Sequence, residues 1–317
     1  MRVVFIGTGE IGLPVLRWLV EAPEHQVVGV VTQPDKPVGR DQRIQASPIK
    51  LAAAGTGIPV LQPIRIKREE AVREVAALAP EVIVVMAYGQ ILPRAVLEIP
   101  KVACLNLHAS LLPRHRGAAP IQSAIVAGDA ESGLTVMYMN EGLDTGDMLL
   151  QSRIPIAPDE SGGSLHDRLA QLAPAALQEA VSLLERGTAP RVAQNSAEAT
   201  YAPKLEREHG LIDWNNPAEL VERKVRAFDP WPGAYTLLED AAGRKRKLKV
   251  FRAGIEPNGE APAGQLVLSP TDGLIVGAGD GALVLQDVQL EGKKRMSAAD
   301  LLRGNSWIAN ATVARGV

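Results

Sequence analysis

The chain has 317 residues, of which 46% are hydrophobic and 22% are charged, and its formal net charge is −2. Such a composition is typical of a globular protein, and the length allows two domains whose cores need neither disulfides nor metal. Aromatic residues make up 3% of the chain, which excludes a nucleic-acid surface built mainly from stacked rings, and the negative total excludes a strongly basic nucleic-acid-binding domain.

Cysteine usage and hydropathy narrow the class of protein further. Cys104 is the sole cysteine, which excludes an internal disulfide framework and a Cys-rich zinc site, and its apolar neighbours predict a buried thiol. No apolar run reaches the ~18 residues that a membrane span needs. The first residues lead into a strand pattern without the features of a signal or transit peptide. We therefore expect a cytoplasmic protein that does not contact membranes.

The first half of the chain alternates apolar runs with amphipathic stretches. Runs rich in Val and Ile predict strands covered on both faces, as in a parallel sheet, at Val3–Ile6, Val27–Val31, Val82–Ala87, Val102–Leu107 and Leu134–Met139. Helical spacing predicts helices at Ile11–Val20, Glu69–Leu78, Ala118–Ala127 and Ser164–Arg186, the last bent by Pro174. This alternation predicts a doubly wound α/β domain with a mostly parallel sheet.

The second half of the chain has a different pattern. Residues 190–206 are polar, include Pro190 and Pro203 and show no clear period, which predicts a linker between a domain of residues 1–189 and one of residues 207–317. Asn216-Pro217 predicts a helix start, with Asn as the cap and Pro in the first position. Short runs separated by turn residues then predict the strands of a small β-barrel, at Ala234–Leu238, Lys247–Arg252, Gln265–Leu268, Leu274–Val276 and Leu283–Gln289.

A dinucleotide-binding fingerprint follows the first predicted strand. Gly7, Gly9 and Gly12 match G-x-G-x-x-G, and Asp35 lies about where a ribose-binding carboxylate falls. Asp35, however, lies in a proline-bounded loop rather than at the tip of the second strand, and a tight strand-to-helix turn needs glycine in any case. An NAD-dependent oxidoreductase therefore stays open as an alternative.

The richest polar cluster follows the strand predicted at Val102–Leu107. Asn106 and His108 alternate with apolar residues, so both side chains point to one side, ~6.6 Å apart along the strand. They lie at its carboxyl end, where open α/β sheets bind their ligands. An amide can donate to a developing oxyanion, and an imidazole can manage the protons of an amine near neutral pH. The pair is therefore suited to acyl transfer onto an amine.

Asp144 follows the strand predicted at Leu134–Met139. A loop after a neighbouring strand can bring this carboxylate to His108, where it would orient the imidazole and stabilise its cation. Structural interpretations remain open for each residue: Asn106 and His108 as strand-end residues bonded by loop backbone, and Asp144 as a turn former beside Gly146. No cluster of His and carboxylate residues has metal-ligand spacing, so no metal is expected.

Around these residues the chain closely resembles the methionyl-tRNA formyltransferase family. Asn106-x-His108 and Asp144 alone are shared with a wider formyl-folate superfamily, whereas the segments after residue 200 are more specific to the tRNA family. The resemblance is carried by Gln33-Pro34-Asp35, Gly39-Arg40, Ser47-Pro48, Ala87-Tyr88-Gly89, Ile91-Leu92-Pro93, Asn106-x-His108, Ser110-Leu111-Leu112-Pro113, Arg116 to Gln122, Gly142 to Asp147, Tyr201-Ala202-x-Lys204-Leu205, Ile212-Asp213-Trp214, Arg226-Ala227-Phe228-x-Pro230-Trp231-Pro232 and Gly304.

The resemblance implies a Rossmann-like formyltransferase domain joined to a C-terminal OB-like β-barrel that binds tRNA. It implies transfer of the formyl group of 10-formyltetrahydrofolate to the amino group of methionine on the initiator tRNA, for translation initiation. Asn106, His108 and Asp144 would be the catalytic residues. The folate would contact Ser110, Leu111, Leu112, Pro113, Tyr88, Gly89, Ile91 and Leu92, and the tRNA would contact Arg40 and Lys204.

Two positions depart from the family pattern. The family usually has proline where Gly9 stands, and this replacement creates the glycine fingerprint; it usually has an aromatic residue at His115. The basic clusters Arg244–Lys247 and Lys293–Arg295 are either a solvated surface or part of a path that follows tRNA phosphates. A non-catalytic RNA-binding protein with an OB-like tail is therefore a third possibility.

Overall fold

The computed structural model describes residues 1–38, 41–256, 259, 261–269 and 273–314. By their internal contacts these residues separate into two compact units, each taken below by itself. The N-terminal unit comprises Met1–Pro120, Glu131–Pro155 and His166–Pro203, and the C-terminal unit comprises Ile121–Ala130, Ile156–Leu165 and Lys204–Val317.

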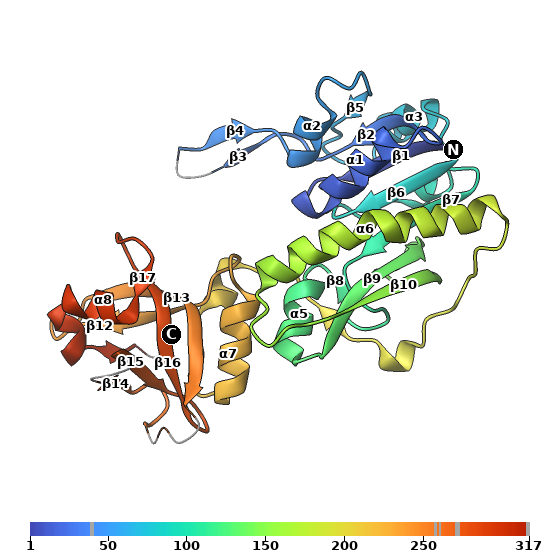
Figure 1. Ribbon diagram of the computed structural model, residues 1–317. Coiled ribbons are helices and arrows are strands. Elements are labelled where there is room, and N and C mark those ends of the chain that lie inside the picture. The colour runs from blue at the N-terminus through green and yellow to red at the C-terminus, as the bar shows by residue number, and fades with distance from the viewer. Residues whose placement is uncertain (39–40, 257–258, 260, 270–272, 315–317) are drawn as a thin grey trace. The chain divides into compact units, whose positions relative to one another are not determined.

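The N-terminal unit is built on one sheet (Figure 1), in the strand order β10-β9-β7-β6-β1-β2-β5. The pairs from β7 to β5 are parallel, whereas β9 pairs antiparallel with β7 and with β10. The strands span Arg2–Gly7 (β1), Gln26–Val31 (β2), Val60–Leu61 (β5), Val82–Met86 (β6), Ala103–His108 (β7), Glu131–Tyr138 (β9) and Met148–Pro155 (β10). The prediction of a mostly parallel sheet is thus confirmed, with an antiparallel edge that the sequence did not predict.

Short strands outside this sheet pair with each other. Strand β3 (Lys36–Val38) pairs with β4 (Arg43–Gln45), and β8 (Arg116–Gly117) pairs with β11 (Tyr201–Ala202). Residues 201–202, predicted to lie in a linker, are therefore held by backbone hydrogen bonds: Arg116 N–H donates to the carbonyl of Thr200 at 2.9 Å, and Ala118 N–H to that of Ala202 at 2.8 Å.

Three long helices of the N-terminal unit follow predicted amphipathic stretches, and two short ones, Pro48–Ala53 (α2) and Arg94–Leu97 (α4), were not predicted. The long helices span Leu13–Glu21 (α1), Glu69–Ala77 (α3) and Gly162–Glu185 (α6), and 3₁₀ turns lie at Glu10–Gly12 (η1) and Ser196–Glu198 (η2). Helix α6 buries Leu169, Ala173, Leu177 and Ala180, because residues three or four apart share one face. Among the described helices, none is both long enough and apolar enough to cross a membrane.

The C-terminal unit contains a nearly closed antiparallel barrel (Figure 1). Its strands follow the order β14-β15-β16-β13-β12-β18, and β17 pairs with β16. They span Tyr235–Glu239 (β12), Lys245–Glu256 (β13), Leu266–Ser269 (β14), Gly273–Gly277 (β15), Ala282–Leu290 (β16), Met296–Ser297 (β17) and Thr312–Val313 (β18). Alternate residues of these strands, such as Leu248, Val250, Leu283 and Leu285, fill its core. The predicted β-barrel is confirmed.

The remaining helical segments span Pro120–Ala127 (α5), Ala218–Ala227 (α7), Ala298–Arg303 (α8), Arg207–Gly210 (η3) and Ser306–Asn310 (η4). The predicted start of α7 was wrong by one residue. The helix begins at Ala218, Pro217 is the cap, and the side chain that accepts from the Ala218 N–H is that of Asp280, at 2.7 Å. A tertiary contact thus replaces the cap predicted from Asn216, because it satisfies the same N–H group.

Candidate active site

Strand β7 carries Asn106 and His108 on one face of the sheet. It lies between β6 and β9, with Asn106 opposite Val85 of β6 and His108 opposite Thr135 of β9. Because strand side chains alternate, the two polar side chains share a side while Leu105 and Leu107 enter the core. His108 is almost fully buried, so few orientations of its ring are possible.

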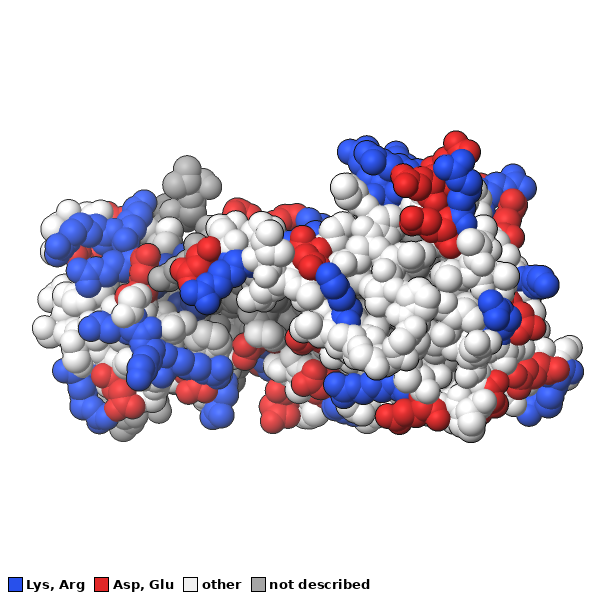
Figure 2. All heavy atoms as spheres, turned by 90° about the horizontal axis from the view of Figure 1, so that it is seen from above, with Lys and Arg blue, Asp and Glu red and all other residues white. Residues whose placement is uncertain are grey.

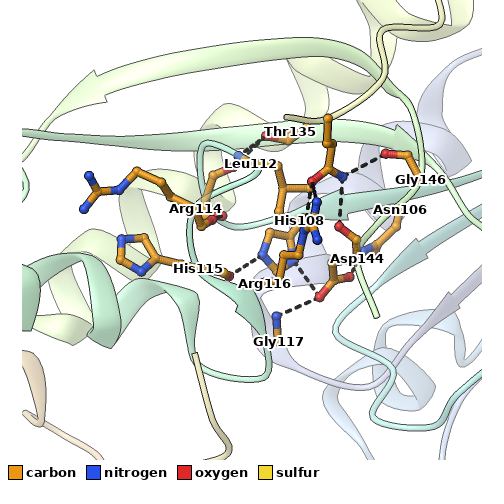
Figure 3. A network of polar contacts seen from close by, with 12 residues as sticks. Asn106, His108, Leu112, Arg114, His115, Arg116, Gly117, Thr135, Asp144 and Gly146 are labelled. Carbon is orange, nitrogen blue, oxygen red and sulfur yellow. Dashed lines mark hydrogen bonds and ion pairs between the residues drawn. The ribbon is translucent and has the colours of Figure 1, made fainter. Parts of the chain in front are cut away.

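The loop between β9 and β10 brings Asp144 to both side chains (Figure 3). Asn106 Nδ2 donates to Asp144 Oδ1 at 3.4 Å, and Asp144 Oδ2 lies 3.6 Å from His108 Nδ1. Since β9 is antiparallel to β7, its end lies beside Leu105, and the loop turns back along β7 to reach His108. The three predicted residues therefore meet, but from an antiparallel hairpin rather than from a parallel neighbour.

Backbone groups of the segment after β7 complete this cluster. Gly117 N–H donates to Asp144 Oδ2 at 2.9 Å, and the carbonyl oxygen of His115 lies 2.9 Å from His108 Nε2. A carbonyl can only accept, so Nε2 carries the proton of this hydrogen bond. Both ring nitrogens thus face oxygen acceptors: a neutral imidazole has one N–H for them, and an imidazolium has two.

His115, where the family usually has an aromatic residue, is itself held in an unusual backbone conformation. Its φ is +59°, its side chain is buried, and its N–H donates to Thr200 Oγ1 at 2.8 Å. The substitution therefore leaves the hydrogen bond to His108 in place, because that bond uses the His115 backbone carbonyl and not its side chain.

Ser110, Leu111, Leu112 and Pro113 form a segment fixed by side chains that sequence reasoning did not select. Thr135 Oγ1 donates to the carbonyl of Ser110 at 2.7 Å and accepts from Leu112 N–H at 3.1 Å. Gln151 Nε2 donates to the carbonyl of Leu112 at 2.7 Å. Thr135 and Gln151 lie on β9 and β10, so only the pairing of these strands reveals their role.

The predicted folate-contacting loop after β6 divides into buried and exposed positions. The side chains of Tyr88 and Leu92 belong to a hydrophobic cluster with Val4 and Ile6 of β1, whereas Ile91 is 80% exposed. Burial raises the pKa of Tyr88 to about 12. The side chains of Tyr88 and Leu92 are therefore packed beneath the loop, and that of Ile91 is exposed on it.

Gln33 holds this loop in place. Its Nε2 donates to the carbonyl of Tyr88 at 2.7 Å, and Thr8 Oγ1 donates to the same oxygen at 3.1 Å. Gly89 has a φ of +81°, and a Cβ there would lie 2.6 Å from Gln33 Nε2. Glycine at this position is thus required both by backbone conformation and by the close approach of Gln33.

Two of the three glycines of the apparent dinucleotide fingerprint have structural explanations. A Cβ at Gly7 would lie 2.7 Å from the ring of Phe5, and one at Gly12 would lie 3.0 Å from the same ring. Asp35 is engaged within the protein: Lys50 Nζ and Gln62 Nε2 each donate to its carboxylate at 2.7 Å, and the hydrogen bond from Lys50 is the main cause that lowers the pKa of Asp35. Tight packing thus accounts for Gly7 and Gly12, and contacts within the protein account for Asp35, whereas a Cβ at Gly9 would lie no closer than 3.4 Å to another atom and packing does not require glycine there.

Neither residue predicted to contact tRNA is among the side chains of this cluster. Arg40 lies outside the described residues. Lys204 belongs to the C-terminal unit, where it is 77% exposed and forms an ion pair of 3.0 Å with Glu206. Within the part of the chain that the structure covers, no group of three or more His, Cys, Asp or Glu side chains is arranged to hold a metal ion.

Lys and Arg side chains gather over the C-terminal unit on the face shown in Figure 2. Several of those in the two basic clusters lie over aromatic rings: Arg246 over Trp307 at 4.6 Å and Arg295 over Phe251 at 4.3 Å. Arg295 also forms ion pairs with acidic residues, among them one of 3.3 Å with Asp287. The clusters are therefore partly neutralised, yet their cationic groups remain at the surface.

Comparison with known proteins agrees with this architecture. The formyl transferase family model matches residues 1–181, and the model of the formyl transferase C-terminal domain matches residues 204–306. Among solved structures, a methionyl-tRNA formyltransferase from Clostridium thermocellum has a TM-score of 0.57 at 16% identity, over 81% of this chain and 95% of that one. HypX from Aquifex aeolicus in complex with tetrahydrofolic acid has a TM-score of 0.61 at 20% identity, over 95% of this chain and 47% of that one.

Curated relatives are closer in sequence. The methionyl-tRNA formyltransferase of Marinobacter nauticus is 48% identical over 97% of both chains, and that of Pseudomonas paraeruginosa is 50% identical over 95% of both. These matches leave the oxidoreductase alternative without support, and they assign the chain to enzymes rather than to non-catalytic RNA-binding proteins. The chain belongs to the methionyl-tRNA formyltransferase family.

Proposed function

We propose that the cluster of Asn106, His108 and Asp144 transfers the formyl group of 10-formyltetrahydrofolate to the amino group of methionine on the initiator tRNA, in the cytoplasm, for translation initiation. The observation that carries this proposal is the meeting of an amide, an imidazole and a carboxylate at one place in a chain of this family. A solved relative is bound to tetrahydrofolic acid, which supports a folate donor.

Each side chain has a separate task in the proposed reaction. The neutral amine attacks the formyl carbon, and the new C–N bond leaves a negative charge on the formyl oxygen. Asn106 Nδ2 donates a hydrogen bond to that oxyanion, and the positive charge of protonated His108 stabilises it. Asp144 orients the imidazole and balances its positive charge. The C–N bond to the folate then breaks, the amine loses its proton, and the folate nitrogen gains one. No step uses a metal.

The contacts of His108 bear on how it moves protons. Its Nε2 donates to the His115 carbonyl, and its Nδ1 faces Asp144. For the ring to take a proton from the amine as a general base, one nitrogen must give up its present contact. An imidazolium that keeps both contacts has no N–H left for the oxyanion, but its positive charge still stabilises the negative charge, so the arrangement supports the electrostatic task in particular.

The surface of the C-terminal unit supports an RNA partner. The clusters Arg244–Lys247 and Lys293–Arg295, together with Lys204, offer cations to tRNA phosphates although the whole chain is slightly acidic. Contacts of this kind set affinity and orientation, while the chemistry stays with the N-terminal unit. Arg40 is proposed as a further contact to the tRNA on the grounds of sequence resemblance alone.

Among the proposed folate contacts, Gly89 and Ile91 are exposed, whereas the side chains of Tyr88, Leu92, Ser110 and Leu112 are buried. Ile91 and the backbone around Gly89 are accessible, and the segment Ser110 to Pro113 is held rigidly by Thr135 and Gln151. A preorganised backbone loses little entropy when a ligand binds. We therefore propose that these two segments bind the folate mainly through their backbone.

Formyl transfer can be measured directly with purified protein. The donor is 10-formyltetrahydrofolate, and the acceptors compared are charged initiator tRNA, charged elongator tRNA and glycinamide ribonucleotide. We expect efficient transfer to the charged initiator tRNA. Transfer to glycinamide ribonucleotide instead, or nicotinamide cofactor binding without any formyl transfer, would overturn the proposal.

The role of His108 has a matched control on α6. His108→Ala should lower the rate ~10²–10⁴-fold by removing proton transfer and charge stabilisation. His166 also contacts a carboxylate, with its Nδ1 2.9 Å from Asp167 Oδ1, but it lies on an exposed part of α6. His166→Ala should leave the rate unchanged, and equal losses in both variants would contradict the assignment of His108.

A further inference from the structure

The segment that follows α6 returns to the loop carrying Asp144. Val192 forms a β-bridge with Met148, the first residue of β10, through backbone hydrogen bonds of 2.8 and 3.0 Å. Two residues further on, the side chain of Gln194 enters the site from a stretch that sequence reasoning treated as linker. Its position follows only from the fold, because 50 residues separate it from Asp144.

The amide of Gln194 uses its full hydrogen-bonding capacity. Nε2 donates to the carbonyl oxygens of Asp144 and Gly146, both at 2.8 Å, and the dashed lines that reach these two labelled residues mark the contacts in Figure 3. Oε1 accepts from Arg116 Nε at 3.0 Å and from Arg116 Nη2 at 2.8 Å. An amide has two N–H donors and an oxygen with two lone pairs, so every one of these groups is engaged.

The loop that Gln194 holds has a backbone that needs support. Asp144 has a φ of +52°, a left-handed conformation that is uncommon for residues other than glycine. A Cβ at Gly146 would lie 1.7 Å from the carbonyl oxygen of Tyr138, so the loop also passes very close to the end of β9. Such a conformation persists where surrounding contacts fix it. Gln194 fixes the conformation of this loop by binding the carbonyl groups of Asp144 and Gly146, on both sides of Thr145.

Gln194 also joins the two parts of the cluster to each other. Through Arg116 it contacts the segment whose next residue, Gly117, donates its N–H to Asp144 Oδ2 at 2.9 Å. One amide therefore sets the distance between the backbone of Asp144 and the group that binds the Asp144 carboxylate. We propose that Gln194 is a positioning residue that holds the Asp144 carboxylate against His108; this inference rests on the function proposed above.

A double-mutant cycle tests this proposal. Gln194→Met removes all four hydrogen bonds at similar side-chain length, and Asp144→Asn removes the carboxylate. If Gln194 acts through Asp144, Gln194→Met should lower kcat by about ten- to a hundredfold in the native background, because displacements of ~1 Å at an active site cost this much. In the Asp144→Asn background it should change kcat by no more than about twofold. The KM for charged tRNA should stay unchanged.

The neighbouring residue provides a matched control. Asn195 lies in the same segment, but its side chain caps η2, accepting from Ala197 N–H at 3.2 Å and donating to Glu198 at 2.7 Å. Asn195→Ala should leave kcat unchanged. Melting temperatures of all variants show whether they fold, and Arg116→Lys, which loses the forked contact to Gln194 Oε1, replaces Gln194→Met in the cycle if that variant does not fold.

The outcomes are distinct. A rate loss that is large in the native background and small beside Asp144→Asn supports the proposal. Equal losses in both backgrounds, or no loss in the native background, overturn it while the activity of the native enzyme still supports the proposed function. If the native enzyme transfers no formyl group, the proposed function itself is wrong.

Discussion

Adding one methyl group at Gly117 tests whether the backbone of the segment after β7 positions the Asp144 carboxylate. Gly117 has a φ of +119°, and a Cβ there would lie 2.5 Å from the carbonyl oxygen of Ala202 and 3.0 Å from the ring of Tyr201. Alanine can be accommodated only if β8 and β11 move apart or if the backbone rotates. Either change moves the Gly117 N–H, which now donates to Asp144 Oδ2 at 2.9 Å.

The expected loss of stability in Gly117→Ala is the sum of two separate effects. The left-handed conformation costs a residue with a Cβ about 1–3 kcal/mol, and overlap in a packed region costs about 1–3 kcal/mol more. Gly117→Ala should therefore lower the free energy of unfolding by about 2–6 kcal/mol. If the donor moves by ~1 Å, the rate of formyl transfer should fall by ~10²-fold.

Gly187 provides the control for backbone strain alone. Its φ is +68°, yet a Cβ there would meet no atom within 4 Å. Gly187→Ala should cost about 1–2 kcal/mol for the left-handed conformation and leave the rate unchanged. Urea unfolding measures the stability of both variants, and formyl transfer to charged initiator tRNA, at a temperature where each is folded, measures their rates.

One result would refute this reasoning. If folded Gly117→Ala transfers the formyl group as fast as the native enzyme, then the Gly117 N–H does not position Asp144 for the reaction. If Gly187→Ala destabilises the protein as much as Gly117→Ala does, close contact with Ala202 is not the cause of the larger effect.

Three further predictions concern buried groups and the tRNA contact. The hydroxyl of Tyr88 is buried without a hydrogen-bond partner among the described residues, so Tyr88→Phe should stabilise the fold by about 1–3 kcal/mol in urea unfolding. Burial raises the pKa of Tyr88 from 10.0 to about 12, so as the pH rises from 10 toward 12 the unfolded chain loses this proton while the folded chain keeps it, and the free energy of unfolding falls. Tyr88→Phe should lessen that decline, and a raised KM for the folate would show instead that the hydroxyl belongs to the pocket. Burial also raises the pKa of the Cys104 thiol to about 12, so thiolate is scarce at pH 8, and iodoacetamide should label Cys104 after unfolding but not before; rapid labelling of active enzyme would contradict its burial. Lys204→Gln should lower the salt slope of tRNA binding by about one unit, while Glu206→Gln should not, and an unchanged slope for Lys204→Gln removes that residue from the interface.

The sequence predicted most helices and strands because each depends on the pattern of polar and apolar residues within its own segment. Apolar runs in the first half became strands of one sheet, all parallel except β9, and alternating runs in the second half became the barrel, since side-chain periodicity determines which faces are buried. Asn106 and His108 were selected as a pair because their spacing within one strand puts them on one side whatever the rest of the chain does. The glycine fingerprint was misleading because a motif does not show packing: Gly7 and Gly12 are glycines because a side chain at either position would collide with the ring of Phe5.

Only the tertiary structure determined how the Asp144 side chain reaches His108 and which residues hold it there. Strand β9 is as apolar as its parallel neighbours, so its composition did not predict its antiparallel direction. The path of the loop to His108 depends on that direction and could not be predicted either. Gln194, Thr135 and Gly117 reach the site through contacts between segments distant in the chain. A hydrogen bond between such segments depends on the three-dimensional path of the backbone, and no spacing along the sequence encodes that path.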